Sequence, residues 1–304
     1  MVASERTANA SFDYVSYLGL GMLALCFASA FYFTSLALTG FSVAATGAAR
    51  IIVAAMFLVP LSLATGQGLP RTFVGWTWAA GFGIVAWVLP FILLVWAQTR
   101  IPTNIIGAFF AGIPLMILFL SWAFLKTGIS LRKWIGIVVG SVGLILLAGP
   151  GTLSQIGSSS EYLAQLAAFL STVGFAAGAI IIRVMPSPSA MQATAGAAMA
   201  SGIMAIPILL VELPGANAGL IPVLGILGVG VFSTGIGQFL RFFLIRRRGP
   251  VFIVPNGYLT AIIAAILGTV LLGESPTLSA MIAFAVILGG LAIASDGSGR
   301  MKQV

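Results

Sequence analysis

Long apolar stretches separated by short polar breaks run from residue 17 to residue 296 of this 304-residue chain. A helix needs about 20 mostly apolar residues to cross roughly 30 Å of hydrocarbon, and stretches of this length recur throughout. Glycine, proline and charged residues divide them into ten predicted membrane-spanning helices: 17–39, 43–65, 74–99, 102–125, 132–149, 161–184, 190–210, 221–246, 249–272 and 278–296. The pattern therefore predicts an all-α polytopic membrane protein.

The composition fits lipid better than water as the solvent. Of the residues, 60% are hydrophobic and only 7% are charged, whereas a soluble domain has about 25% charged residues. The net charge of +8 would indicate nucleic-acid binding only if Lys and Arg gathered on one water-facing patch, and here they stand between apolar stretches. We predict the lipid bilayer and a small-molecule substrate as partners, and no nucleic acid.

Residues that carry most catalytic and metal chemistry are scarce. The chain has no histidine, and its one cysteine, Cys26, lies within the first apolar stretch. An intrachain disulfide, a thiolate metal site and a histidine base are therefore impossible. With no paired carboxylates inside a span and no phosphate-binding loop for ATP, we predict that the protein is not an enzyme and uses no cofactor and no metal.

The distribution of positive charge predicts the orientation. With the N-terminus inside, the inside segments hold eleven Lys and Arg residues, whereas the outside loops hold Arg100 alone. Cytoplasmic loops of membrane proteins carry such an excess. We therefore predict an inner or plasma membrane protein whose tails, 1–16 and 297–304, are both cytoplasmic.

The chain divides into two halves of five spans, 17–149 and 161–296, joined by an external linker at 150–160. The stretch 50–60, which begins with Arg and ends with Pro, matches 197–207 in length and in its final proline. Because five is odd, the second half must cross the membrane in the opposite sense to the first. Such inverted repeats are typical of secondary transporters with a midplane site.

Small residues four apart recur in the last span of each half. Gly136 and Gly140 stand in the first half, and Ala285 and Gly289 stand at the aligned positions of the second. Small residues at this spacing let two helices approach closely in lipid. We predict that these two spans are equivalent packing elements, serving one monomer or a homodimer.

With these features the chain resembles the EamA-type ten-helix transporters of the drug/metabolite transporter superfamily over residues 17–296. The resemblance rests on AARIIVAAMFLVP (48–60) and on PVFIVPNGYLTAIIAAILGTVLLGESPTLSAMIAFAVILGG (250–290), with its Gly-Glu turn at Gly273 and Glu274 followed by Ser279. Two departures stand out: Ala197 where the first half has Arg50, and Lys126 where the family commonly has Glu.

The resemblance implies a secondary transporter that exports small amphiphilic metabolites by alternating access. Within the family the chain is most similar to exporters of amino acids, aromatic ones included; efflux of lipophilic drugs or other metabolites is the alternative. No Asp or Glu lies inside any predicted span, whereas carriers coupled to protons or sodium generally place carboxylates near the midplane. We therefore predict a facilitator or exchanger without an obligatory carboxylate proton relay.

A site for a small amphiphile needs aromatic walls and a few convergent polar groups. Gln238 and Asn256 stand out, because an amide in hydrocarbon needs bonding partners; each could serve the substrate or only bond a neighbouring helix. The predicted substrate-binding residues are Tyr32, Trp78, Trp87, Phe109, Phe110, Ser233, Gln238, Asn256 and Tyr258, and Ser171, Thr172, Thr234 and Thr260 are further polar candidates.

Two arginines lie inside predicted spans. Arg50 in 43–65 could bind a substrate carboxylate, or it could be a structural residue that bonds neighbouring carbonyls. Arg241 in 221–246 lies nearer the cytoplasmic end, where its long side chain could reach the interface.

Prolines and glycines inside spans indicate where helices bend. Proline removes a backbone hydrogen bond and clashes with the preceding turn. We predict that the third, fourth, eighth and ninth spans bend to open and close two gates. The predicted hinge residues are Pro90, Pro114, Pro255, Gly112 and Gly235.

Overall fold

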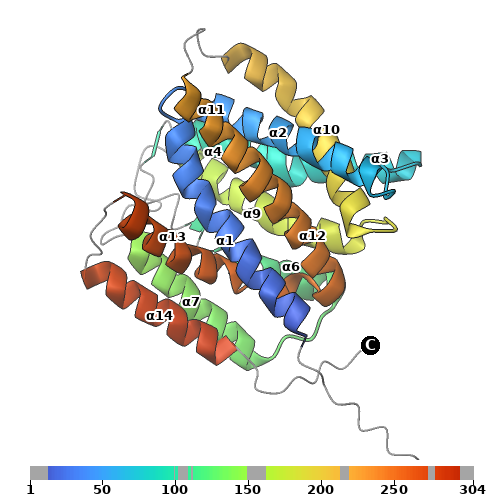
Figure 1. Ribbon diagram of the computed structural model, residues 1–304. Coiled ribbons are helices and arrows are strands. Elements are labelled where there is room, and N and C mark those ends of the chain that lie inside the picture. The colour runs from blue at the N-terminus through green and yellow to red at the C-terminus, as the bar shows by residue number, and fades with distance from the viewer. Residues whose placement is uncertain are drawn as a thin grey trace, which may run out of the picture.

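The computed structural model describes residues 13–98, 100–101, 109–110, 112–148, 162–212, 219–272 and 278–294 (Figure 1). The regular elements in these ranges are all helices, which confirms the predicted fold class. The linker 150–160, the distal tails and the Gly273–Glu274 turn lie outside the described residues.

Apart from the fourth predicted span, where 102–108 and 111 lie outside the described residues and α6 begins at Ile113, the helices follow the predicted spans within a few residues. The first half contains α1 (Tyr14–Ala37), α2 (Val43–Ala64), α3 (Phe73–Phe82), η1 (Gly83–Val88), α4 (Leu89–Gln98), α6 (Ile113–Leu125) and α7 (Leu131–Ala148). The second half contains α9 (Tyr162–Val184), α10 (Ala190–Glu212), α11 (Leu220–Leu227), η2 (Gly228–Ile236), α12 (Gly237–Arg248), η3 (Pro250–Ile253), α13 (Asn256–Leu272) and α14 (Leu278–Ala294). In the described part of the chain, six helices are long and apolar enough to cross a membrane, with shorter apolar helices beside them.

The two halves make equivalent contacts. Helix α1 packs against α11, η2, α12 and α13, and its counterpart α9 packs against α3, η1, α4 and α6. Helix α2 pairs with α10 and α7 pairs with α14, so each of these pairs joins counterparts (Figure 1). Exchanging the halves therefore reproduces the packing. Because each half has an odd number of spans, that exchange also inverts the direction of crossing, so the five-helix repeats are inverted.

Hydrogen bonds show that the start of α1 and the ends of α9 and α12 lie together at one end of the bundle. The guanidiniums of Arg247 and Arg248 pair with the Asp13 carboxylate at 3.1 and 3.2 Å. The Arg183 guanidinium donates to the Arg246 carbonyl at 2.7 Å. These five residues define what we name the basic end. Hydrogen bonds from Arg247 hold the pKa of Asp13 well below its usual range, so these ion pairs persist at neutral pH.

The opposite end has its own link between the halves. The Ser42 hydroxyl, at the start of α2, donates to the Glu212 carboxylate at the end of α10 at 2.8 Å. At the basic end, α2 ends and α10 begins. There the Gln192 amide, at the start of α10, donates to the carbonyls of Gln67 and Leu69, both at 3.2 Å. The α2–α10 pair is therefore bonded across the halves at both membrane faces.

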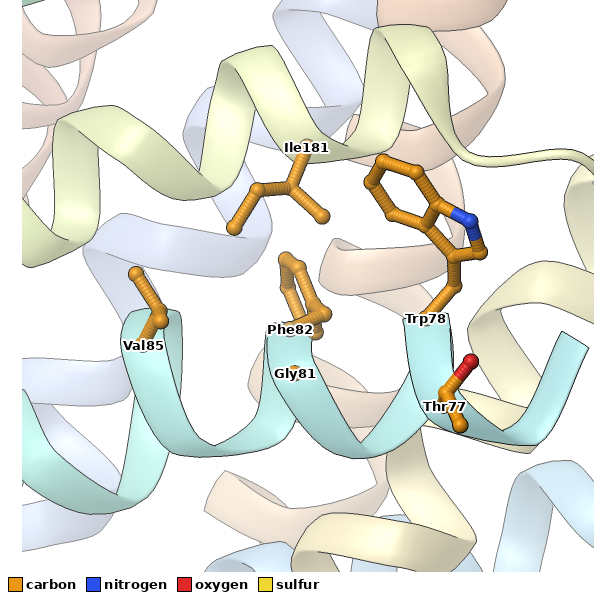
Figure 2. A pocket seen from close by; sticks show the side chains of 6 residues that line it. All are labelled: Thr77, Trp78, Gly81, Phe82, Val85 and Ile181. Atoms are coloured by element: carbon orange, nitrogen blue, oxygen red, sulfur yellow. The ribbon is translucent and has the colours of Figure 1, made fainter. Parts of the chain in front are cut away.

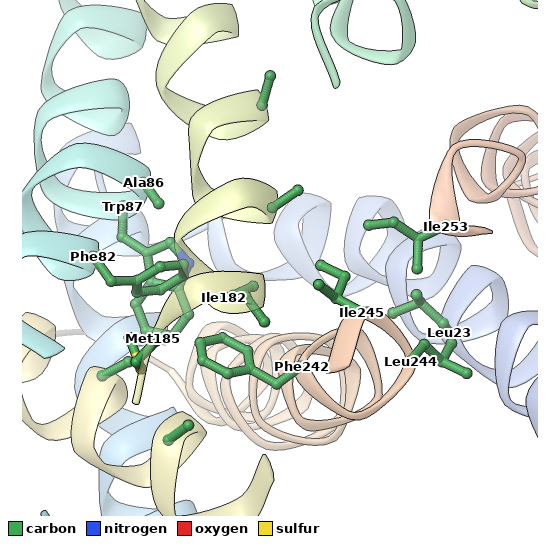
Figure 3. Close-up of a cluster of buried hydrophobic side chains, with 14 of the residues drawn as sticks. Leu23, Phe82, Ala86, Trp87, Ile182, Met185, Phe242, Leu244, Ile245 and Ile253 are labelled. Atoms are coloured by element: carbon green, nitrogen blue, oxygen red, sulfur yellow. The ribbon is translucent and has the colours of Figure 1, made fainter. Parts of the chain in front are cut away.

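Large aromatic side chains form the core between α3, η1 and α12 (Figure 3). The Phe82 ring meets the rings of Trp87 and Phe242 edge to face, at centroid distances of 5.3 and 5.0 Å. Such edge-to-face pairs are favoured because the positive ring edge meets the negative ring face. This core holds span three against span eight, its counterpart in the second half.

Glycines bring α7 and α14 close enough for their backbones to touch. A Cβ on Gly136 would lie 2.6 Å from the Gly290 carbonyl oxygen, and a Cβ on Gly143 would lie 2.7 Å from Ile287. The predicted packing role of these spans is confirmed. In α14, however, the residue at the contact is Gly290, whereas a Cβ on Gly289 would have no heavy atom within 4 Å.

The four spans predicted to bend are all irregular helices. Spans three and eight each contain a π-helical segment, η1 and η2. Pro114 lies in the first turn of α6, where its missing N–H costs nothing, because the helix is interrupted at Gly112. Pro255 lies in a turn between η3 and α13. Thus Pro114 and Pro255 interrupt their spans rather than kinking continuous helices as the sequence suggested.

Candidate functional site

Arg50 extends from the third turn of α2 toward the π-helical segment of span eight. Its Nε donates to the Thr234 hydroxyl at 3.0 Å, and that hydroxyl donates to the Val229 carbonyl at 2.8 Å. A π-turn frees backbone carbonyls for such bonds, and π-helical segments are frequent at functional sites. The half-buried Arg50 side chain is thereby fixed inside the bundle.

Three phenylalanines continue from Arg50 across the bundle. The Arg50 guanidinium carbon lies 5.7 Å from the centre of the Phe91 ring. Phe91 meets Phe175 of α9 edge to face at 5.3 Å, and Phe110 meets Phe175 in the same manner at 5.7 Å. These rings make an aromatic wall, Phe91–Phe110–Phe175, to which α4, α9 and the segment before α6 each contribute.

Arg241 of α12 bonds to the backbone of Phe175, one of the three residues of this wall. Its Nη2 donates to the Phe175 carbonyl at 3.0 Å, and its side chain is only 8% exposed. The sequence had suggested that Arg241 reaches the membrane interface. Instead it points inward, where a cation is costly to bury without a partner.

Hydroxyl groups of the counterpart helices α1 and α9 bond to spans eight and three, respectively. The Ser29 hydroxyl of α1 lies 3.1 Å from that of Ser233 in η2. The Ser171 hydroxyl of α9 donates to the Pro90 carbonyl at 2.9 Å. Thr172, in contrast, bonds the Ala168 carbonyl of its own helix at 3.0 Å. The predicted residues Ser233 and Pro90 therefore lie where these counterpart helices meet spans eight and three.

Several predicted polar residues bury a polar atom that has no hydrogen-bond partner in the described structure. These atoms are the side-chain oxygens of Gln238, Asn256 and Thr260 and the indole nitrogen of Trp87. Asn256 is 7% exposed and begins α13, directly after Pro255. A buried polar atom without a partner is costly, so each is a candidate to bind a substrate or water.

Other predicted residues have contacts that do not involve Arg50. The Tyr258 hydroxyl donates to the Ile137 carbonyl at 2.9 Å and so joins α13 to α7. Tyr32 has its ring 5.7 Å from that of the neighbouring Phe33. Phe109 packs against a small buried cluster in which Ala97 and Ile101 meet alanines near the start of α9.

Trp78 lines a hollow between α3, η1 and α9. Figure 2 shows Trp78, Phe82 and Val85 facing Ile181. The hollow that they line has a volume of about 240 Å³. A second hollow, of about 230 Å³, lies at the basic end beside Arg71, Ser187 and Gln192. Neither hollow is lined by Arg50 or by the aromatic wall.

The sequence alone did not single out Phe91 or Phe175. Each is one of 21 phenylalanines in apolar sequence, with no local pattern that separates it from packing residues. Arg50 could be identified from the sequence as a candidate, because it is a cation inside a predicted span. Its partners Thr234 and Phe91 could not, because they come from distant segments of the chain. Their proximity depends on how the two halves pack.

Comparisons with known proteins agree with the two-repeat architecture. A family model described as the EamA-like transporter family matches residues 16–149 and again 162–295. The inner membrane transporter YedA of Escherichia coli (strain K12) is 26% identical over 257 residues, covering 82% of this chain and 80% of that protein. Protein PecM of Dickeya dadantii (strain 3937) is 23% identical over 254 residues, covering 80% and 82%.

One solved crystal structure has a similar fold. It superposes with a TM-score of 0.76 at 20% sequence identity, covering 92% of this chain and 96% of its own. At this identity the likeness concerns the fold alone.

Proposed function

Because this chain belongs to the EamA-like transporter family, we propose that it exports small amphiphilic metabolites by alternating access, with amino acids, aromatic ones included, as the substrate class. The inner membrane location of the relative YedA supports the same location for this chain. An alternating-access carrier mechanism fits the inverted repeats, because such repeats can form two equivalent gates around one central site.

The position of Arg50 carries the proposal. Its Nε bonds Thr234, its guanidinium lies over Phe91, and no acidic side chain of the described residues bonds to it. A guanidinium binds a carboxylate through two parallel hydrogen bonds, and an aromatic wall beside it accepts an apolar side chain. A carboxylate with an attached ring fits both features.

Counterflow in proteoliposomes tests this proposal. Vesicles loaded with each common amino acid in turn are given a trace of the same labelled compound outside. A carrier accumulates the label transiently and saturably, whereas a channel does not. Transport of lipophilic dyes that excess amino acid fails to inhibit would favour the drug-efflux alternative, and no counterflow with any compound would contradict the carrier.

We propose that spans three, four, eight and nine move during the cycle. Their irregular segments lack regular helical hydrogen bonding, so they can change direction at lower cost than α2 or α10. Replacing Pro255 with Ala should extend α13 toward η3 and slow counterflow several-fold. Pro207→Ala, inside the continuous helix α10, is the matched control, and equal rates in the two variants would argue against a hinge at Pro255.

We propose that the basic end faces the cytoplasm. The inward preference of Lys and Arg supports this orientation, and the structure gathers them at one end with the start of α1 and the end of α12. Fluorescent protein fused after residue 304 should therefore fluoresce, whereas alkaline phosphatase at the same position should be inactive. The reverse pair of results would contradict the orientation.

A further inference from the structure

The charge inside the bundle has one sign. The chain has six acidic residues: Glu5, Asp13, Glu161, Glu212, Glu274 and Asp296. Five of these positions fall outside the described helices, and Glu212 is the last residue of α10, where it accepts the Ser42 hydroxyl. In the described helices, the charges away from both ends are therefore those of Arg50 and Arg241.

These two arginines lie at different depths along the bundle. Helix α2 starts at the end opposite the basic end. Arg50 lies about 10 Å along α2 from that start, given a rise of 1.5 Å per residue. Arg241 is about 10 Å before the basic end of α12 by the same measure. Phe91 and Phe175 connect them: Phe91 lies under the Arg50 guanidinium, and the Phe175 carbonyl accepts from Arg241. A carboxylate that crosses the bundle along this wall would meet a cation in each half of the membrane.

We infer that the preferred substrates are aromatic carboxylates that carry no ammonium group, and that their transport moves net negative charge. This inference rests on the proposed export of small amphiphilic metabolites, and within them it favours aromatic carboxylates without an ammonium group over amino acids. In an amino acid the ammonium is attached to the carbon beside the carboxylate, so a carboxylate bound to Arg50 brings a second cation toward the first. Like charges brought together are unfavourable, and the side chains of Gln238 and Asn256 are neutral, so they carry no negative charge to offset the ammonium.

Net charge movement would also supply the driving force. An anion that leaves a negatively charged cytoplasm is driven outward by the membrane potential. At about 100 mV this potential favours the outside over the inside concentration of a monovalent anion by roughly 50-fold at equilibrium. A carrier for such an anion needs no coupling ion. This accounts for a pathway without carboxylates, the groups with which carriers generally bind a proton or sodium.

Three compounds with the same phenyl ring test the inference on the purified full-length protein. They are 3-phenylpropanoate, phenylalanine and 2-phenylethylamine, which at neutral pH are an anion, a zwitterion and a cation. By calorimetric titration, 3-phenylpropanoate should bind at least about ten-fold more tightly than phenylalanine, and 2-phenylethylamine should not bind. Arg50→Gln should remove most of the difference between the first two compounds, and Arg50→Lys should retain part of it.

Proteoliposomes with a potassium gradient and valinomycin test the movement of charge. An inside-negative potential should speed the efflux of 3-phenylpropanoate and leave phenylalanine unchanged, with protein-free vesicles as the background. Phenylalanine binding as tightly as 3-phenylpropanoate, or efflux indifferent to potential, would overturn the inference while leaving the proposed amino-acid carrier intact. Absence of counterflow with all three compounds and with every amino acid would overturn both.

Discussion

Arg50→Gln is expected to reduce the affinity for a carboxylate substrate by about 10- to 100-fold, because hydrogen bonds to charged groups are worth about 1.5–3 kcal/mol. Glutamine has one amide where arginine has a guanidinium, so the two-bonded contact with a carboxylate and the positive charge are both lost. The glutamine amide can still donate to Thr234, which preserves the link between α2 and η2. The fold should therefore survive the change.

The measurement is the half-saturating concentration for counterflow, together with the amount of protein that elutes as a single species in detergent. Thr234→Val is the matched control, because it breaks the same 3.0 Å hydrogen bond from the other side and leaves the charge in place. We expect a few-fold effect from Thr234→Val and a much larger one from Arg50→Gln. Equal small effects would show that Arg50 is a structural residue, the alternative that the sequence left open.

The span pattern could be predicted from the sequence because lipid imposes a simple rule. A backbone in hydrocarbon must satisfy its own hydrogen bonds, so apolar length and polar punctuation are enough to locate helices. The predicted span 190–210, for instance, corresponds to α10, Ala190–Glu212. The odd number of spans in each half then predicted the inverted arrangement before any contact was known.

The interruptions in spans four and nine were harder to place. Proline inside an apolar run indicates a bend, but the sequence does not say whether the helix kinks or stops. At Pro255 it stops, because the preceding residues form a 3-10 segment and a turn. The π-helical segment η2 has no proline at all, and its only local signal was a set of closely spaced glycines.

The candidate site could be predicted only in part, because its members come from different repeats. Arg50 and Thr234 are 184 residues apart in the chain, and nothing local in either segment indicates the other. The repeat comparison could not supply the pairing, since Ala197 stands where Arg50 would recur and is fully buried. The halves share a fold but differ in the side chains they place at the centre.

This asymmetry limits how far symmetry can be used to assign function. Equivalent helix contacts, such as those of α1 with span eight and of α9 with span three, follow the repeat. The charged groups do not, because Arg50 has no charged counterpart. We therefore propose that the symmetric helix contacts form the gating framework and that the unique side chains recognise the substrate.

The contact between α7 and α14 gives the sharpest stability prediction. Gly290→Ala should destabilise the protein by about 1–3 kcal/mol, the usual effect of inserting a methyl group where there is no space. The added Cβ would lie 2.6 Å from the Gly136 carbonyl oxygen. Because the obstacle is backbone rather than a flexible side chain, the two helices would have to separate along their length.

Gly289→Ala is the control, one residue away in the same helix. Its Cβ would have no heavy atom within 4 Å, and alanine favours a helix over glycine by about 1 kcal/mol, so the variant should be as stable as the parent or slightly more so. Thermal unfolding of the purified protein in detergent compares the two, and Gly290→Ala should melt several degrees lower. Equal melting temperatures would mean that α7 and α14 are not tightly packed in solution, because only a rigid contact can distinguish two adjacent glycines.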